Sequence, residues 1–201
     1  MYSPNPFKMN DKSRCHNFIE QFSFGVMVSN GLDASHLPFL LNREEGEQGV
    51  LYAHLSRANP QWRELEDRDA LIIFQGPHGY ISPSWYSSKP AVPTWNYAAV
   101  HAKGKVELLD DEATLALVEN LTEKYEPALL DDSEVMSLEL NRRLLRGIVG
   151  FKIAIASLQG TEKLGQNRKE QDILGIEQGL LASESQEALQ LLAYMQQVRG
   201  D

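Results

Sequence analysis

The chain has little cysteine and no long apolar run. Its 201 residues include one cysteine, Cys15, which excludes an internal disulfide. Cys15 lies in an expected helix with no basic-acidic relay beside it, which argues against a catalytic thiol. No apolar stretch approaches the length that spans a bilayer, and the N-terminus lacks the basic-then-apolar order of a signal peptide. These absences predict a cytoplasmic protein, and its length and 42% hydrophobic content suffice for a full core.

Positive charge is also scarce. The chain carries 28 acidic and 19 basic residues, a formal net charge of −9. Its densest basic cluster is Arg142, Arg143 and Arg146, whose helical spacing places them near a helix C-terminus, where cations stabilise the helix dipole. This interpretation is favoured over a DNA-binding surface, because no segment has the character of a DNA-reading helix.

Familiar metal and nucleotide motifs are missing. The five histidines, at positions 16, 36, 54, 78 and 101, never form a closely spaced ligand pair, and no carboxylate accompanies them at a recognised spacing. The sequence contains no G-x-S-x-G elbow and no glycine-rich phosphate loop. We therefore expect no metal centre, and hydrolase and NTPase functions are disfavoured.

Aromatic residues, in contrast, are concentrated in one segment. Residues 51–97 hold three tryptophans, four tyrosines, two histidines and five of the nine prolines. Aromatic side chains interleaved with Ser, Arg, Asn, Gln and His form a surface suited to a flat, polar, phosphorylated ligand. The alternative is a rigid, proline-punctuated β-region with structural tryptophans, and composition alone does not separate the two.

Periodicity predicts a mainly β chain framed by helices. Apolar alternation or apolar runs predict strands at 24–29, 34–42, 49–56, 70–76, 98–109 and 147–160. Three- and four-residue spacing predicts helices at 11–22 with Asp11 as cap, at 111–125 capped by Asp110 or Asp111, from Ser133 onward, and at the C-terminus after a Ser183–Gln186 capping box. Asn30-Gly31 is typical of a two-residue hairpin turn. The expected architecture is a closed antiparallel barrel of six or seven strands with helical insertions.

Five motifs occur in the order and spacing of one family. They are HLPFLL (36–41), AHLSRANPQW (53–62), FQGPHGYISPSWY (74–86), VPTWNYAAVH (92–101) and KLGQNR (163–168), and the chain opens with MYSPNPF. Together they resemble the PaiB-like proteins, the FMN-binding negative transcriptional regulators. The resemblance covers residues 1 to about 180.

The resemblance implies an α+β, mainly β fold, the FMN-binding split β-barrel related to pyridoxamine phosphate oxidase-like flavoproteins. Residues 1–162 would form the barrel, and residues 163–201 a C-terminal cofactor-contacting segment and helix of the same globular unit. Split barrels hold FMN between two chains, so a bacterial homodimer with FMN at the subunit interface is expected. An apolar stripe on the last helix, Leu191, Leu192, Met195 and Val198, favours a dimer, because an isolated barrel has no evident place to bury it.

The resemblance also assigns the cofactor phosphate to the end of strand 49–56. Ser56 and Arg57 match the start of the Ser-Arg-Lys sequence of the oxidases, and they offer a hydroxyl donor and a rigid guanidinium fork to a phosphate dianion. Ala58 stands in place of the lysine. The missing contact would then come from Asn59, Lys163 or Arg168.

His54 is a further candidate beside the phosphate, and Arg57 has a second possible role. His54 and Ser56 share one side of the strand, so His54 is expected to face the phosphate as well. Arg57 could instead be structural and clamp a carboxylate such as Glu64 or Glu66.

The remaining candidates surround the flavin ring. The backbone of His36 and Leu37 would meet its pyrimidine edge, and His36 is equally well explained as a hydrogen-bonded barrel histidine. Trp95 or Trp85 would stack on the ring. Further contacts are implied for Thr94, Asn96, Lys163, Gln166, Asn167 and Arg168, while Trp62 would pack at the barrel lip.

Three functions are compatible with these features. The family name implies a flavin-linked repressor of gene expression, with DNA as a partner from the name only. An FMN-dependent oxidoreductase is the second, because flavin itself supplies redox chemistry. A haem-binding split barrel is the third, since the aromatic, histidine-containing cleft would also admit haem.

Overall fold

Strands of alternating apolar residues form one sheet in the computed structural model, which describes residues 1–200 apart from the side chains of Leu138 and Asn141. Seven strands follow the order β3-β2-β6-β7-β8-β5-β4, and the short β1 pairs with β8. Their bounds are Lys8–Met9 (β1), Phe24–Val28 (β2), Ala34–Pro38 (β3), Leu40–Asn42 (β4), Val50–Ser56 (β5), Asp69–Ile81 (β6), Thr94–Leu108 (β7) and Ile148–Lys163 (β8). The expected antiparallel fold is confirmed, although within residues 1–200 the end strands β3 and β4 do not pair, so the barrel is open.

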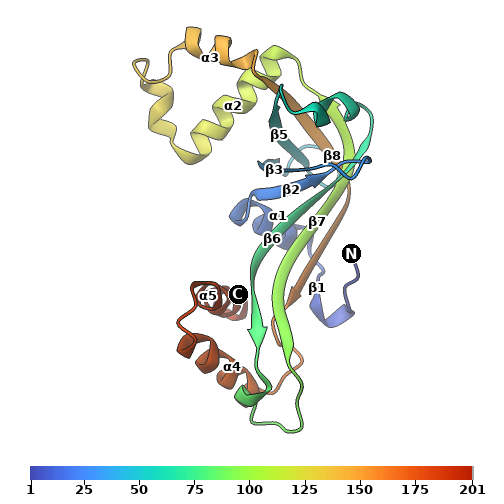
Figure 1. Cartoon of the computed structure of the whole chain (residues 1–201), viewed down its shortest axis with the longest axis vertical. Helices are drawn as coiled ribbons and strands as arrows, with labels where there is room; N and C mark the ends of the chain where they lie inside the picture. The colour runs from blue at the N-terminus through green and yellow to red at the C-terminus, as the bar shows by residue number, and fades with distance from the viewer. Residues whose placement is uncertain (201) are drawn as a thin grey trace. The chain divides into compact units, whose positions relative to one another are not determined.

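Five α-helices accompany the strands (Figure 1). They are Lys12–Gln21 (α1), Asp111–Tyr125 (α2), Leu138–Leu145 (α3), Glu170–Ala182 (α4) and Gln186–Gly200 (α5), with 3-10 turns at Asn5–Phe7, Pro60–Glu64, Pro83–Trp85 and Pro127–Asp131. The expected caps of the first two are present. Asp11 accepts from the Ser13 amide at 3.0 Å, and Asp110 from the Ala113 amide at 2.8 Å.

Three local expectations are wrong. The helix expected from Ser133 begins at Leu138, because Ser137 is its cap and accepts from the Leu140 amide at 3.2 Å. Helix α4 was not expected, and Ser183 ends it by donating to the Leu180 carbonyl at 2.7 Å, so Ser183 does not cap α5. The β2–β3 hairpin is present, but its turn runs from Ser29 to Asp33 with Leu32 in the left-handed conformation (φ 67°).

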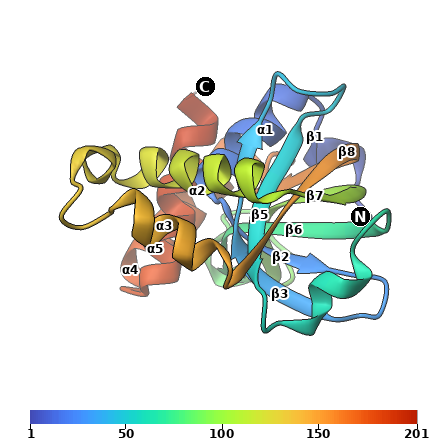
Figure 2. The same ribbon diagram turned by 90° about the horizontal axis from the view of Figure 1, so that it is seen from above.

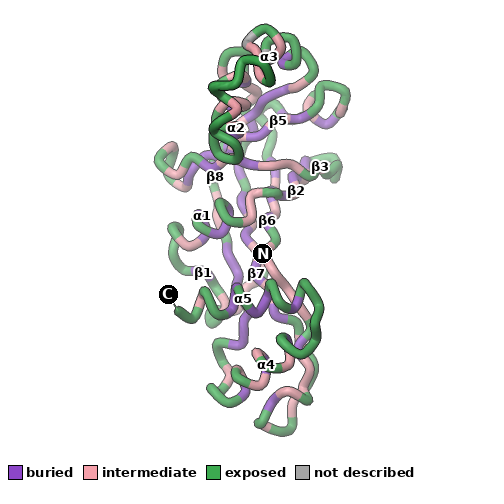
Figure 3. The backbone as a smooth tube through the Cα atoms, turned by 90° about the vertical axis from the view of Figure 1, so that its left-hand side faces the viewer, coloured by how far each residue is buried: buried purple, intermediate pink, exposed green. Residues whose placement is uncertain are grey.

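The residues group into two compact units. We call residues 16–74 and 101–158 the central unit, and residues 1–15, 75–100 and 159–201 the terminal unit. Figure 3 shows that buried residues concentrate on the strands. The domain boundary implied at residue 162 stays a prediction.

In the central unit, β5 pairs with β8 from Val50↔Ala154 to Ser56↔Ile148. Leu51, Ala53 and Leu55 of β5 are buried in the core, while the residues between them face α2, which crosses β5 (Figure 2). This approach of α2 requires glycine at position 150, since a Cβ there would lie 2.4 Å from Thr114 Oγ1.

In the terminal unit, α5 packs beside β6 and β7 (Figure 1). Leu191 and Met195 are fully buried there, and a Cβ at Gly79 would lie 3.0 Å from Leu191 Cδ2. The apolar stripe of the last helix is therefore largely covered within this unit. The expectation that a single chain has no place to bury this stripe is wrong.

Helix α4 lies directly against Trp85 in the terminal unit. A Cβ at Gly179 would lie 2.2 Å from the Trp85 ring, and one at Gly175 would lie 2.0 Å from the Trp85 carbonyl oxygen. We expect Gly179→Ala to lower the free energy of unfolding by about 1–3 kcal/mol, because the indole must move. Urea unfolding measures this change, and Gly200→Ala, at a position with open space, is the control.

Candidate functional site

The end of β5 presents the first group of candidate residues. Along this strand Tyr52, His54 and Ser56 alternate with buried apolar side chains, as expected for residues that share a face. Ser56 is exposed, and its Oγ accepts from the Ala58 amide at 3.3 Å. Because this bond uses a lone pair, the Ser56 hydroxyl keeps its proton as a donor.

Arg57 fastens the end of β5 to the start of β8. Its Nε donates to the Arg146 carbonyl at 2.9 Å, and its Nη2 donates to the Ile148 carbonyl at 2.8 Å. No ion pair joins Arg57 to Glu64 or Glu66 in the described part of the chain, so the alternative of a carboxylate clamp is wrong. Backbone carbonyls are its partners instead. The side chain is exposed, and its Nη1 makes no hydrogen bond within residues 1–200.

A second arginine lies close by. The guanidinium carbons of Arg57 and Arg63 are each 5.8 Å from the centroid of the Trp62 ring. The Trp62 Nε1 donates to the Arg57 carbonyl at 3.0 Å, which fixes the indole. Cation–π contact with Trp62 therefore orients two exposed guanidinium groups in the segment that follows Ser56. The sequence signal for Arg63 was its place directly after the AHLSRANPQW motif.

Asn59 and Gln61, in the same AHLSRANPQW motif, form hydrogen bonds that hold the β2–β3 hairpin. Asn59 accepts from the Gln61 amide at 3.0 Å and donates to Ser35 Oγ at 2.9 Å. The side-chain amide of the buried Gln61 also contacts this hairpin. Its Oε1 accepts from Ser35 Oγ at 2.6 Å, and its Nε2 donates to the Asp33 carbonyl at 2.9 Å and to Ser29 Oγ at 3.2 Å. Both polar atoms of the Asn59 side chain are thus engaged, one in capping the Pro60–Glu64 turn and one in binding Ser35 of β3, which leaves less capacity for the phosphate contact assigned to it.

His54 lies next to Ser56 on the face covered by α2. It pairs with Gly150 across the β5–β8 ladder, at the place where Thr114 approaches. Its Nδ1 is buried and has no hydrogen-bond partner within residues 1–200. Burial lowers the pKa of His54, so the neutral imidazole is favoured.

This burial predicts a pH-dependent stability. Near its ordinary pKa of 6.5 the unfolded His54 binds a proton that the folded one does not, so stability is present above that pH and falls as the pH drops. The same sign applies to His101, whose pKa burial also lowers. We expect the free energy of unfolding to decrease between about pH 7 and 5, and His54→Phe and His101→Phe each to flatten this slope in urea titrations. Unchanged slopes in both variants would contradict the assignment.

His36 and Leu37 lie on β3, in the same unit. His36 is exposed, with its ring centroid 6.3 Å from that of Phe24, and Leu37 pairs with Gly25 of β2. An exposed imidazole beside an exposed phenyl ring is accessible to a ligand, and the backbone assignment for both residues stays a prediction.

The other candidates belong to the terminal unit. Lys163 Nζ donates to Thr94 Oγ1 at 2.5 Å, so the structure brings these two together. Asn96 is buried, and its Nδ2 donates to the Met195 sulfur of α5 at 3.9 Å. A ligand contact by Asn96 would require α5 to move.

The loop 163–168 is organised mainly by its own residues. Gln166 accepts from the Leu164 amide at 2.9 Å and donates to the Glu162 carbonyl at 2.5 Å. The Arg168 guanidinium lies over the Tyr86 ring at 4.5 Å. Gly165 adopts the left-handed conformation (φ 89°), which suits glycine. Asn167 is exposed and keeps its amide available to a ligand.

Sequence reasoning missed a buried carboxylate beside this loop. Glu162 accepts from the Tyr194 hydroxyl of α5 at 2.5 Å and pairs with Arg14 at 2.7 Å. Burial and this bond raise the pKa of Tyr194, so the phenol stays protonated. Burial also raises the pKa of Cys15 to about 11, which makes it a poor nucleophile. No local sequence pattern identifies such a cluster.

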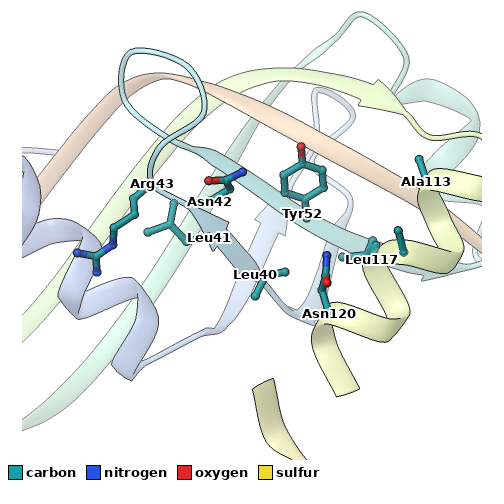
Figure 4. Close-up of a pocket in the computed structure, with 9 residues that line it drawn as sticks. Leu40, Leu41, Asn42, Arg43, Tyr52, Ala113, Leu117 and Asn120 are labelled. Atoms are coloured by element: carbon teal, nitrogen blue, oxygen red, sulfur yellow. The ribbon is translucent and has the colours of Figure 1, made fainter. Parts of the chain in front are cut away.

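The central unit also contains a pocket of about 470 Å³ between α2 and strands β4 and β5 (Figure 4). Its walls are Leu40, Leu41, Ala113, Ala116 and Leu117, with Asn42, Arg43, Tyr52 and Asn120 as polar groups. The Tyr52 hydroxyl donates to Glu45, and Arg43 is paired with Glu20, both at 2.5 Å. Two of the polar groups are therefore engaged with carboxylates, and the pocket has little capacity to bind an anion.

Within residues 1–200, no three His, Cys, Asp or Glu side chains converge in a way that could hold a metal ion. The helices of the same residues are too short or too polar for any of them to cross a membrane.

The chain matches a known protein family. The family described as "Putative FMN-binding domain" matches residues 1–157. The chain is 38% identical to the protease synthase and sporulation protein PAI 2 of Bacillus subtilis, over 98% of this chain and 97% of that protein. It is also 32% identical to an uncharacterized protein of Emericella nidulans, over 74% of each.

Solved structures share the fold. The flavocytochrome Anf3 from Azotobacter vinelandii superposes with a TM-score of 0.63 at 16% identity, covering 84% of this chain and 75% of that one. An FAD and heme binding protein from Mycobacterium smegmatis gives 0.60 at 16% identity, covering 83% and 78%. At this identity the likeness concerns the fold alone, and it confirms the split-barrel expectation.

Proposed function

This chain belongs to the family of FMN-binding domains, and from that premise we propose that it is a flavin-linked regulator of gene expression that grips the FMN phosphate at the end of β5. FMN is the cofactor of the family. The proposal concerns which residues hold FMN and which biological role FMN binding has.

The observation that carries the proposal is the pair of exposed arginines that contact Trp62 just after Ser56. A phosphate dianion needs several donors in a partly exposed position. The Ser56 hydroxyl keeps its proton, Arg57 keeps its Nη1, and the Arg63 guanidinium lies within 5.8 Å of the centroid of the Trp62 ring, as that of Arg57 does. These residues fit a phosphate, and Arg63 supplies the second cation that Ala58 cannot.

The other residues would serve the rest of the cofactor. In the central unit, His36 and the backbone of Leu37 would meet the pyrimidine edge or the ribityl chain, and His54 would face the phosphate on the same side of β5 as Ser56. In the terminal unit, Asn167 offers its side-chain amide, Lys163 and Thr94 are hydrogen-bonded to each other, and Asn96, Gln166 and Arg168 are held by their neighbours. When bound, FMN would supply the redox-active ring; these side chains would bind and orient it.

The regulatory role rests on the similarity to the Bacillus subtilis protein, whose name refers to protease synthesis and sporulation. With a net charge of −9, direct DNA binding is expected to be weak and steeply dependent on salt. Fluorescence anisotropy with labelled duplex measures this. Tight, sequence-selective binding by the purified protein at physiological salt would contradict an indirect role.

A homodimer with FMN at the subunit interface remains part of the proposal. Its support is the family's split-barrel fold, in which two chains share the cofactor. Sedimentation of the FMN-saturated protein should give a two-chain species, and a strict monomer with flavin bound would contradict the shared site.

An absorbance spectrum tests the flavin assignment itself. Spectra of the purified protein are recorded before and after FMN addition, and the visible bands of the added FMN should differ from those of free FMN. An unperturbed spectrum together with a Soret band would favour haem and overturn the proposal.

A further inference from the structure

Three rings on β6 and β7 form an aromatic cluster in the terminal unit: His78, Tyr80 and Trp95. The centroids of His78 and Trp95 are 5.9 Å apart with their planes at 30°, and Tyr80 meets Trp95 edge-on at 6.4 Å. Tyr80 is 49% exposed and Trp95 is 48% exposed. Large rings that contact one another and still face solvent form a preorganised surface for a further ring.

The cluster lies on the face of these strands that α5 leaves open. Gly79 and Asn96 are chain neighbours of the cluster, and both face α5, at Leu191 and Met195 respectively. Because successive side chains of a strand point to opposite faces, Trp95 and Tyr80 point away from that helix. One face of the strands is thus packed, and the opposite face carries the rings.

His78 gives the cluster a directed hydrogen-bond donor. The Trp95 Nε1 donates to His78 Nδ1 at 3.4 Å. Since Nδ1 accepts, the proton of the neutral imidazole is assigned to Nε2, which becomes a donor. A ligand that stacks on the rings would therefore meet an N–H at its edge.

Cations of the neighbouring loops are committed elsewhere. Lys89 donates to the Pro83 carbonyl, Lys163 donates to Thr94, and Arg168 lies over Tyr86. The cluster thus favours a ring with one or two acceptor oxygens over a ligand that carries a phosphate dianion.

We propose that the His78–Tyr80–Trp95 cluster is a second binding site, which takes a planar aromatic molecule bearing a carboxylate or carbonyl on its edge. The ring stacks on Trp95 and Tyr80, and the edge oxygen accepts from His78 Nε2. Trp95, which the resemblance assigns to the flavin ring, would here serve a second ligand, and occupation of the cluster does not require flavin.

Calorimetric titration of the flavin-free full chain with 2-naphthoate tests this, with decahydro-2-naphthoate as the saturated analogue. We expect the flat acid to bind about tenfold tighter, as base–aromatic stacking does. Trp95→Leu and Tyr80→Leu should each weaken 2-naphthoate about tenfold. His78→Phe keeps a ring but removes the donor, and it should cost tenfold or more, as a charge-assisted hydrogen bond does.

Tyr2→Leu is the matched control, because Tyr2 is an 88% exposed tyrosine of the same unit without a ring contact among residues 1–200. It should leave binding unchanged. Equal affinity for both acids overturns the proposal. So does competition between FMN and 2-naphthoate, since the rings would then belong to the flavin site. Loss of a dimer in Trp95→Leu with unchanged naphthoate binding would assign the cluster to an interface between copies. If Trp95→Leu does not fold, the Tyr80 and His78 variants decide.

Discussion

Arg57→Ala should weaken FMN binding roughly tenfold to a hundredfold and leave riboflavin binding almost unaffected, because riboflavin lacks the phosphate. A charge-assisted contact to phosphate is worth about 1.5–3 kcal/mol, which corresponds to that range. Parallel fluorescence titrations with the two flavins measure the difference. We expect Arg63→Ala to act in the same direction, since the Trp62 ring orients both arginines.

Riboflavin separates this effect from a structural one. Arg57 also binds the carbonyls of Arg146 and Ile148, so its loss should lower the melting temperature as well. That structural damage would weaken both flavins equally. Arg43→Ala removes another arginine of the central unit, paired with Glu20, and should change neither affinity. Equal losses of FMN and riboflavin in Arg57→Ala would assign Arg57 to the fold alone.

Tyr194→Phe should lower the free energy of unfolding by about 1.5–3 kcal/mol, because it removes a hydrogen bond to a buried charged group. Glu162 is only 4% exposed, and it would keep Arg14 as its partner. Urea unfolding at neutral pH measures the change. Tyr2→Phe removes an exposed hydroxyl and should have no effect. A change below about 0.5 kcal/mol in Tyr194→Phe would show that Glu162 does not fasten α5 to β8.

Motifs and caps were sufficient to predict much of the fold. Asp11 and Asp110 cap their helices as expected, because an N-cap depends on one side chain and the amides just after it. The strands at 24–29 and 49–56 were predicted from local alternation, which records one buried face. Ser133 was wrongly predicted to start a helix because Ser137, four residues later, is the actual cap. Ser183 was wrongly predicted as a cap because it ends α4 instead. The sequence alone does not rank caps of similar strength.

The sequence indicated which types of residue could bind a ligand, but not which of them are already hydrogen-bonded within the protein. Ser56 and Trp95 are exposed and available to ligands, whereas Asn59 and Asn96 are held by distant parts of the chain. Those partners, Ser35 and Met195, are far away in sequence, so a linear pattern contains no sign of them. The Arg57 contacts to backbone carbonyls were hidden for the same reason, because a carbonyl carries no residue identity.

The central claim is that the end of β5 recognises the phosphate of FMN, and comparing FMN with riboflavin on the unmodified protein tests it most directly. Titration of the flavin-free chain, followed by flavin fluorescence, should give FMN an affinity at least about tenfold higher than that of riboflavin, and the difference should shrink as salt rises. Equal affinities for the two flavins, or no saturable binding of FMN, would contradict the account.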